Sequence, residues 1–177
     1  MTAATSASAR PADASPEDSG FLDAMAALAG GVCVVTALTA EGHPAGFTST
    51  AVMSLSRDPQ LLAIGVGRTG RTLPALLGGG RRFALNILHA GGEHMARRFA
   101  DRPADRFVGL EWSAEEATGV PLLVAHCSYT VLCRVVQDIP AGDHHLLVSA
   151  VERIVTGSGG PTALVHHDRR YHMLGAA

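Results

Sequence analysis

The sequence predicts one mainly β domain, an antiparallel barrel with a few short helices. Short extended runs bounded by Gly, Pro, Asp and His recur along the chain, whereas only two short helical runs separate them. A doubly wound parallel sheet would need a longer helix between successive strands. The chain has 177 residues and no internal repeat, which suits a single domain.

The domain is expected to open with a short helix. Phe21, Leu22, Met25 and Leu28 recur at helical spacing, and Gly30-Gly31 supplies a C-terminal stop. The preceding segment is rich in Ala, Ser, Thr and Pro and has neither the basic start nor the apolar run of a secretory signal. We therefore expect residues 1–19 to be a disordered tail and residues 20–177 to form the domain.

The rest of the chain alternates extended runs with turns. Val32–Ala40 and Phe47–Ser56 read as a hairpin around the turn residues of Glu41–Gly46. Brief helices are expected at Thr72–Leu77 and Glu93–Ala100, and a loop over Asp101–Thr118. The remaining expected strands are Leu61–Val66, Phe83–Leu88, Leu122–Val136, Leu146–Val155 and Thr162–His166.

Composition excludes several functions. The 14 basic residues are all Arg and are nearly balanced by 16 acidic ones, so no basic stripe marks a nucleic-acid surface. The absence of Lys removes Schiff-base chemistry and any Walker A loop. No run approaches the ~18–20 apolar residues of a membrane span. The three cysteines lack CxxC spacing, which indicates buried thiols in a reducing cytoplasm.

A glycine motif and two histidine pairs each suggest a specific kind of binding site. Gly65–Gly70 matches GxGxxG after an apolar strand, but the following helix is too short, and the next strand ends at Asn86–His89 with no acidic residue before Glu93. A Rossmann site is therefore rejected. His144-His145 and His166-His167 suggest metal ligands. Adjacent residues on a strand point to opposite faces, so we expect no metal site.

Thr48-Ser49-Thr50-Ala51 places hydroxyls close together on one expected strand. Taken alone, this pattern also fits an ordinary half-buried strand in which Ser and Thr alternate with Val52 and Leu55. The stretch is nevertheless suited to binding the polar edge of a planar ring.

Several motifs together resemble one family, the short-chain flavin reductases of two-component flavin-dependent monooxygenases. From about Phe21 to Tyr171 the matching segments keep the family's order. They are GVCVVT (Gly31–Thr36), GFTSTAVMSLSRDP (Gly46–Pro59), RTL (Arg71–Leu73), FALNIL (Phe83–Leu88), ARRFA (Ala96–Ala100), DRF (Asp105–Phe107), GDH (Gly142–His144) and His166–Tyr171. The resemblance implies a split β-barrel that binds FMN or FAD, usually as a homodimer with flavin near the subunit interface.

The resemblance also assigns residues to the flavin and to the dinucleotide. It implies that Arg71 and Thr72 meet the flavin phosphate at a helix start, and that Arg98 makes a further phosphate contact. The flavin site implied in this way comprises Gly46, Phe47, Thr48, Ser49, Thr50, Ala51, Gly65, Val66, Gly67, Arg71, Thr72, Arg98 and Phe99. Many relatives carry Ser at the position of Gly70.

For the dinucleotide, the resemblance makes His144 the residue that orients the nicotinamide. His166, His167, Asp168 and Tyr171 match the late segment that helps bind the dinucleotide in relatives. For each of these residues taken singly, a terminal strand capped by exposed polar residues is an interpretation with nearly as much support.

The activity implied is hydride transfer from NADH, or NADPH, to FAD or FMN, with the reduced flavin passing to a partner monooxygenase. Because the cofactors carry the chemistry, the protein mainly has to stack two rings. Two other classes stay open, a non-catalytic flavin carrier or sensor and a pyridoxamine phosphate oxidase-like enzyme on the same barrel. The Arg, Ala and Gly bias suggests a bacterial source and a role in secondary metabolism.

Overall fold

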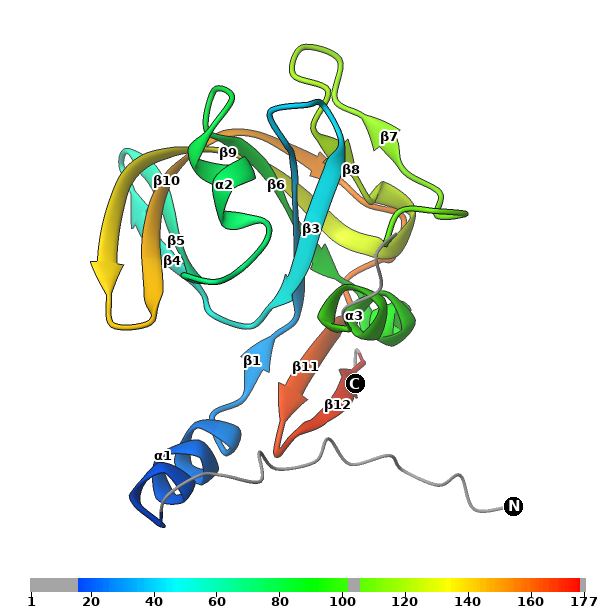
Figure 1. Ribbon diagram of the computed structural model, residues 1–177. Helices are drawn as coiled ribbons and strands as arrows, with labels where there is room; N and C mark the ends of the chain where they lie inside the picture. The colour runs from blue at the N-terminus through cyan, green and yellow to red at the C-terminus, as the bar shows by residue number, and fades with distance from the viewer. Residues whose placement is uncertain (1–15, 102–105, 176–177) are drawn as a thin grey trace.

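A computed structural model describes residues 16–101 and 106–175. It has a curled sheet as its main body and a smaller group of elements that stands off below it (Figure 1). The strands of the main sheet are β2 (Cys33–Leu38), β3 (Pro44–Ser49), β4 (Val52–Arg57), β5 (Gln60–Gly67), β6 (Arg82–Leu88), β9 (Cys127–Ala141) and β10 (His144–Thr156). The smaller group comprises α1 (Pro16–Ala26), β1 (Gly30–Gly31), β11 (Ala163–His167) and β12 (Arg170–Leu174).

Short helices and a minor strand pair complete the fold. They are α2 (Leu73–Leu77), α3 (Glu93–Ala100), the 3-10 helices η1 (Ala90–Gly92) and η2 (Val124–His126), and the paired strands β7 (Ser113–Ala114) and β8 (Pro121–Leu122). The predicted Glu93–Ala100 helix is confirmed at both ends. Thr72 forms the N-cap of α2 rather than its first residue.

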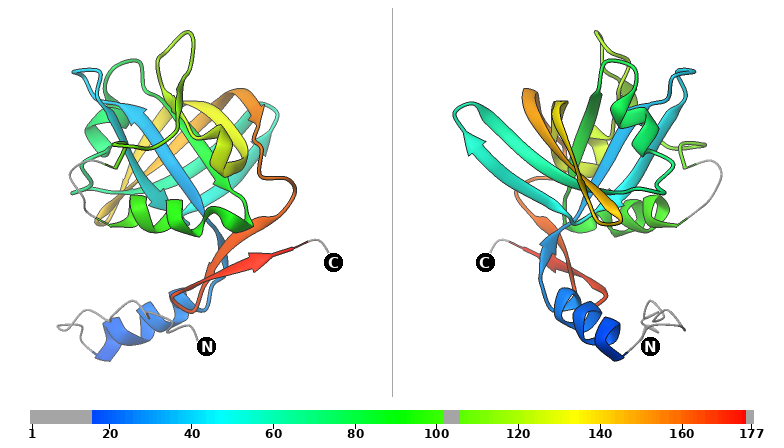
Figure 2. Two further views of the ribbon diagram at one scale, coloured as in Figure 1. Left: turned by 90° about the vertical axis from the view of Figure 1, so that its right-hand side faces the viewer. Right: turned by 60° about the vertical axis from the view of Figure 1, so that its left-hand side comes forward.

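The seven-stranded sheet runs β3-β2-β6-β9-β10-β5-β4, with every neighbouring pair antiparallel. It curls into an incomplete barrel, which Figure 2 shows from two sides. The prediction of a mainly β antiparallel split barrel is confirmed, as is the rejection of a parallel dinucleotide-binding sheet.

The predicted single strand Phe47–Ser56 is wrong. The chain breaks at Thr50-Ala51, so its first part pairs with β2 and its second part with β5, at opposite edges of the sheet. The Gly65 amide donates to the Ala51 carbonyl at 2.8 Å, which ties the break to β5. An extended run with alternating polarity gives no sign that its two halves pair with different strands, because both halves have the same pattern.

Near its two ends the chain forms the smaller group. Strand β12 turns back on β11 through Asp168 and Arg169, whose φ values are 47° and 59°. The Asp168 amide donates to the Ala26 carbonyl at 2.7 Å, and Arg169 pairs with Asp23 at 2.6 Å. The expected strand Thr162–His166 is present, whereas β12 was not predicted. Helix α1 begins at Pro16, inside the segment expected to be a disordered tail, and residues 1–15 lie outside the described part.

A buried amide holds the centre of the sheet together. The Asn86 side chain on β6 donates to the Val34 carbonyl at 3.0 Å and to the Thr36 hydroxyl at 3.1 Å. Its oxygen accepts from the Leu123 amide at 2.9 Å and from the Thr130 hydroxyl at 3.0 Å. Each donor and acceptor of this side chain has a partner, so its complete burial costs little folding free energy.

The cysteines are buried free thiols, as predicted. Burial raises the pKa of Cys33 and of Cys133 to about 12, which leaves both thiols protonated and unreactive near neutral pH. Among the described residues, no helix combines the length and apolar character needed to cross a membrane.

Candidate functional site

The candidate site is a cavity of about 390 Å³ between β3, the end of β5, the loop after β5 and the end of α3. Its volume falls within the ~300–1,000 Å³ of small-molecule sites. One wall is apolar and another carries two guanidinium groups. The lining residues are Phe47, Thr48, Val66, Gly67, Thr69, Gly70, Arg71, Thr72, Phe99, Ala100 and Arg106.

Close contact between α3 and β3 forms the apolar wall. A side chain at Gly46 would meet the Val35 carbonyl at 2.8 Å and the Phe99 ring at 2.9 Å, so the ring can pack here only because Gly46 has none. The Thr48 hydroxyl donates to the Ala96 carbonyl at 2.6 Å and holds the helix in place. Phe99 is thereby fixed against the strand, with Ala100 beside it in the cavity wall.

The positive side of the cavity comes from Arg71 and Arg106. The Arg106 side chain donates to the Gly46 carbonyl at 2.7 Å and to the Asp101 carbonyl at 3.1 Å, so it bridges β3 and the end of α3. Burial, and then the positive charge of Arg71, lower the pKa of Arg106. No carboxylate in the described part of the chain forms an ion pair with either arginine. The pair therefore favours an anion.

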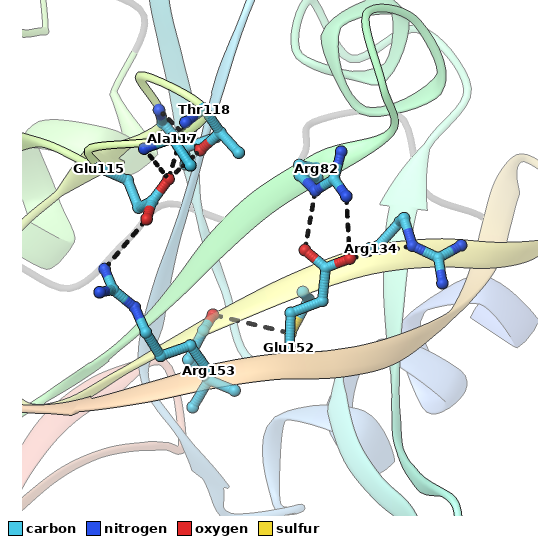
Figure 3. Close-up of polar contacts among 10 residues, drawn as sticks. Arg82, Glu115, Ala117, Thr118, Arg134, Glu152 and Arg153 are labelled. Atoms are coloured by element: carbon cyan, nitrogen blue, oxygen red, sulfur yellow. Dashed lines mark hydrogen bonds and ion pairs between the residues drawn. The ribbon is translucent and has the colours of Figure 1, made fainter.

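A second cavity, of about 350 Å³, gives a useful contrast because its charges are already neutralised. Arg82 and Arg134 both bind Glu152, at 2.8 and 3.0 Å, while Arg153 pairs with Glu115 at 3.2 Å (Figure 3). These arginines lower the pKa of Glu152. Because the ion pairs are satisfied among themselves, they have a structural role, and this cavity is the poorer candidate for a charged ligand.

The loop between β5 and α2 gives the site its backbone groups. The Gly70 amide donates to the Gly67 carbonyl at 2.8 Å, and a side chain at Gly70 would meet that carbonyl at 2.9 Å. The tight turn thus favours Gly at position 70. Helix α2 has only five residues, so its dipole adds little to an anion site. Arg71 and Thr72 both line the cavity, and their expected phosphate contact stays a prediction.

His144 lies at the rim of this loop. It begins β10 and pairs with Gly67, and its imidazole lies close enough that a side chain at Gly67 would meet it at 3.8 Å. Asp143 binds the His144 Nδ1 at 2.8 Å, and the contact lowers the pKa of the Asp143 carboxyl. The carboxylate fixes the ring orientation, so Nε2 is the nitrogen left to face a ligand.

The neighbouring histidine is directed elsewhere. His145 binds Asp138 at 2.7 Å across the hairpin and is mostly buried. The two imidazoles therefore have separate carboxylate partners. No group of three possible metal ligands occurs among the residues that the structure describes.

The structure brings part of the predicted flavin set together and leaves part aside. The cavity includes Phe47, Thr48, Val66, Gly67, Arg71, Thr72 and Phe99. Ser49, Thr50, Ala51 and Gly65 lie at the adjoining strand break, where the Ser49 hydroxyl accepts from the Ala51 amide at 3.2 Å. The predicted hydroxyls of Thr48 and Ser49 are thus engaged with the protein. Gly46 acts through the packing of Phe99 and does not line this cavity.

Arg98 does not line the cavity, and its predicted phosphate contact stays a prediction. Its Nε donates to the Arg106 carbonyl at 2.6 Å and its terminal nitrogen donates to the Val108 carbonyl, so the side chain holds the loop after α3. Arg106 is the arginine in the cavity instead. The DRF motif contains it, but sequence reasoning used that motif only as a family match and missed its position in the cavity.

The predicted dinucleotide residues lie on the β11–β12 hairpin and do not line the cavity of the same chain. His166 packs edge-on against Tyr171 with ring centroids 5.2 Å apart, and the Arg97 guanidinium lies 5.2 Å from the centre of the Tyr171 ring. His167 and Asp168 are exposed at the turn. Helix α3 thus contacts this hairpin through Arg97 and the cavity through Phe99.

The residues present suit a flavin. A planar ring system can pack along Phe47, Val66 and Phe99, while the arginines offer donors to a phosphate. No residue of the cavity has to supply a nucleophile, because a flavin and a nicotinamide carry hydride chemistry themselves.

Comparison with known proteins agrees with this chemistry. The flavin reductase like domain model matches residues 25–175. A flavin reductase (NADH) of Kitasatospora aureofaciens is 42% identical over 80% of this chain and 71% of its own length. The reductase component of 4-hydroxyphenylacetate 3-monooxygenase from Thermus thermophilus is 36% identical over 87% and 95%. Component B of nitrilotriacetate monooxygenase from Mycobacterium thermoresistibile superposes with a TM-score of 0.83, at 26% identity over 90% and 87%.

The contact at Gly46 yields a stability prediction. Gly46→Ala should lower the free energy of unfolding by about 1–3 kcal/mol, because the added methyl group overlaps the Val35 carbonyl and the Phe99 ring. Denaturant unfolding measures the change. Gly31→Ala is the control, since its methyl group would meet nothing within 4 Å. Equal stability of the two variants would contradict the close packing of α3 on β3.

Proposed function

Since this chain belongs to the flavin reductase like domain family, we propose that it is an NAD(P)H:flavin oxidoreductase that moves a hydride from NADH, or NADPH, to FAD or FMN. The observation that carries this proposal is the cavity itself. It joins an apolar wall for a ring system to two arginines without described carboxylate partners, with His144 at its rim.

Each side of the cavity has a proposed task. Phe47, Val66 and Phe99 support the ring, Gly65 to Gly67 let backbone approach it, and Arg71 binds the phosphate. Bound flavin would supply the hydride acceptor, and nicotinamide the donor. His144, oriented by Asp143, holds the nicotinamide at its carboxamide or pyrophosphate. The protein therefore contributes position more than acid–base chemistry.

A homodimer forms part of the proposal. Apolar side chains stand exposed on α1, just after it and on β12, where Phe21 is 65%, Leu28 69% and Met173 72% exposed. Such a surface favours coverage by a second copy. In a dimer, the hairpin carrying His166, His167, Asp168 and Tyr171 could serve the dinucleotide at the partner's cavity. A reducing cytoplasm suits the three free thiols.

The reduced flavin is proposed to act on a separate flavin-dependent monooxygenase. The described elements are those of the barrel, its short helices and strand pair, and the smaller group of α1, β1, β11 and β12. The similar Thermus protein is named as a reductase component, which supports the same division of labour. Secondary metabolism in bacteria is the proposed setting.

The whole proposal is tested by oxidation of NAD(P)H followed at the nicotinamide absorbance band, with and without FMN or FAD. Oxidation should require flavin and should yield hydrogen peroxide in air, because released reduced flavin reacts with oxygen. A carrier or sensor would bind flavin without oxidising NAD(P)H. A pyridoxamine phosphate oxidase-like enzyme would oxidise its amine substrate without NAD(P)H.

A two-compartment version of this assay tests delivery. When a membrane that passes flavin but not protein separates this chain from a flavin-dependent monooxygenase, hydroxylation should persist at reduced yield. Catalase should lower net oxygen consumption without changing the initial rate of nicotinamide oxidation. If hydroxylation appears only when the proteins are mixed, reduced flavin is transferred directly between them and not by free diffusion.

Removal of Arg71 should affect only phosphorylated flavins. Arg71→Ala should raise the Michaelis constant for FMN by roughly 10-fold or more, which corresponds to ~1.5–3 kcal/mol for a charge-assisted hydrogen bond. Riboflavin, which lacks the phosphate, should respond little. Arg68→Ala, a change of equal charge in the same loop but outside the cavity, is the control. Equal losses for FMN and riboflavin would make Arg71 structural.

Removal of His144 should affect the dinucleotide step. His144→Ala should slow flavin reduction in anaerobic stopped-flow mixing with NADH and leave the flavin dissociation constant nearly unchanged, since the imidazole lies at the cavity rim. His43→Ala in the exposed β2–β3 turn is the control. Lost flavin affinity with normal hydride transfer would contradict this assignment.

A further inference from the structure

A smaller cavity of about 120 Å³ adjoins the main one, and Arg71, Thr72 and Arg106 line both. Its remaining walls are Pro44, Ala45, Gly46 and Phe107, from the start of β3 and the loop after α3. The two arginines thus stand at the boundary between the two cavities.

The side cavity is too small to be a ligand site of its own. Small-molecule sites usually enclose ~300–1,000 Å³, and only the main cavity reaches that range. A ligand group in the side cavity therefore belongs to a molecule whose larger part occupies the main cavity. That molecule has to continue past the arginines.

The hydrogen bonds of Arg106 leave it able to bind an anion at this boundary. A guanidinium has five N–H donors. Three described bonds, to the carbonyls of Gly46 and Asp101, hold the group between β3 and α3. Two donors therefore remain without a described partner. The backbone bonds fix the group in advance, which lowers the entropy cost of binding an anion.

The charge next to Arg106 argues against a purely structural role. A guanidinium that only tied two backbone segments together would gain nothing from a second cation nearby. Yet Arg71 lines the same two cavities as Arg106 and lowers its pKa, while the Asp101 carboxylate acts in the opposite direction. Neither arginine forms a described ion pair. The repulsion is relieved when a ligand brings negative charge to both groups.

We propose that this chain prefers FAD to FMN, that Arg106 determines the preference by binding the second phosphate, and that the side cavity receives the group beyond it. The proposal rests on the proposed flavin reductase function. In FMN the phosphate ends the molecule, so the side cavity stays unused. In FAD each phosphate can meet one arginine, and the adenosine end continues toward Pro44 and Phe107.

The test measures dissociation constants of riboflavin, FMN and FAD by calorimetry, for the wild-type chain and for Arg106→Met and Arg68→Met. Methionine keeps an unbranched apolar chain and removes the charge. Wild type should bind FAD at least about 10-fold more tightly than FMN. Arg106→Met should weaken the binding of FAD by about 10-fold or more and the binding of FMN much less, and it should leave the binding of riboflavin unchanged. Arg68→Met should leave all three values unchanged.

Equal affinity of the wild-type chain for FMN and FAD would overturn the proposal, as would equal losses for both in Arg106→Met. A variant effect on the Michaelis constant for NADH or NADPH alone would assign Arg106 to the dinucleotide instead and also overturn it. If Arg106→Met also loses affinity for riboflavin, the substitution has damaged the cavity itself. The ratio of FAD affinity to FMN affinity in the wild-type chain then decides whether the proposal stands. FAD preference without any oxidation of NAD(P)H would refute the reductase function and leave this inference standing.

Discussion

The functional cavity depends on how closely α3 approaches β3, and that approach is possible because Gly46 has no side chain. The Phe99 ring occupies the space that a Cβ atom would need. The bond from Thr48 to the Ala96 carbonyl and the bridge from Arg106 to Gly46 secure the same contact at 2.6 and 2.7 Å. Ring support and positive charge are therefore set by one packing contact, so a change at Gly46 would disturb both.

The arginines of this chain fall into two groups that differ in their surroundings: some form ion pairs with carboxylates, and others line a cavity without such pairs. Arg82, Arg134 and Arg153 have carboxylate partners and hold the outer surface of the sheet together. Exposed pairs of this kind contribute little stability each. Arg71 and Arg106 instead face a cavity without such partners in the described chain. Sequence alone cannot separate the two groups, because the partners of an ion pair can lie far apart along the chain, as Arg82 and Glu152 do with a separation of 70 residues.

The fold was largely predictable because hydrophobic periodicity and turn residues act locally. The strand break at Thr50-Ala51 was not, since it depends on which distant strand each half pairs with. The presence of Arg106 in the cavity lining, where Arg98 is not, has a similar origin. Arg106 lies eight residues beyond Arg98 and outside α3, and spacing along the sequence does not show that its guanidinium reaches back to the Gly46 carbonyl.

Helix α3 also connects the two parts that a reductase has to coordinate. Phe99 faces the cavity, whereas Arg97, two residues earlier, lies against Tyr171 of the β11–β12 hairpin. Tyr171 packs on the same apolar cluster as Phe99, so the hairpin and the cavity wall share one small core. A ligand that moves the hairpin would therefore act on the cavity wall that Phe99 forms. This shared packing, rather than a common pocket, is the physical link between the β11–β12 hairpin and the cavity.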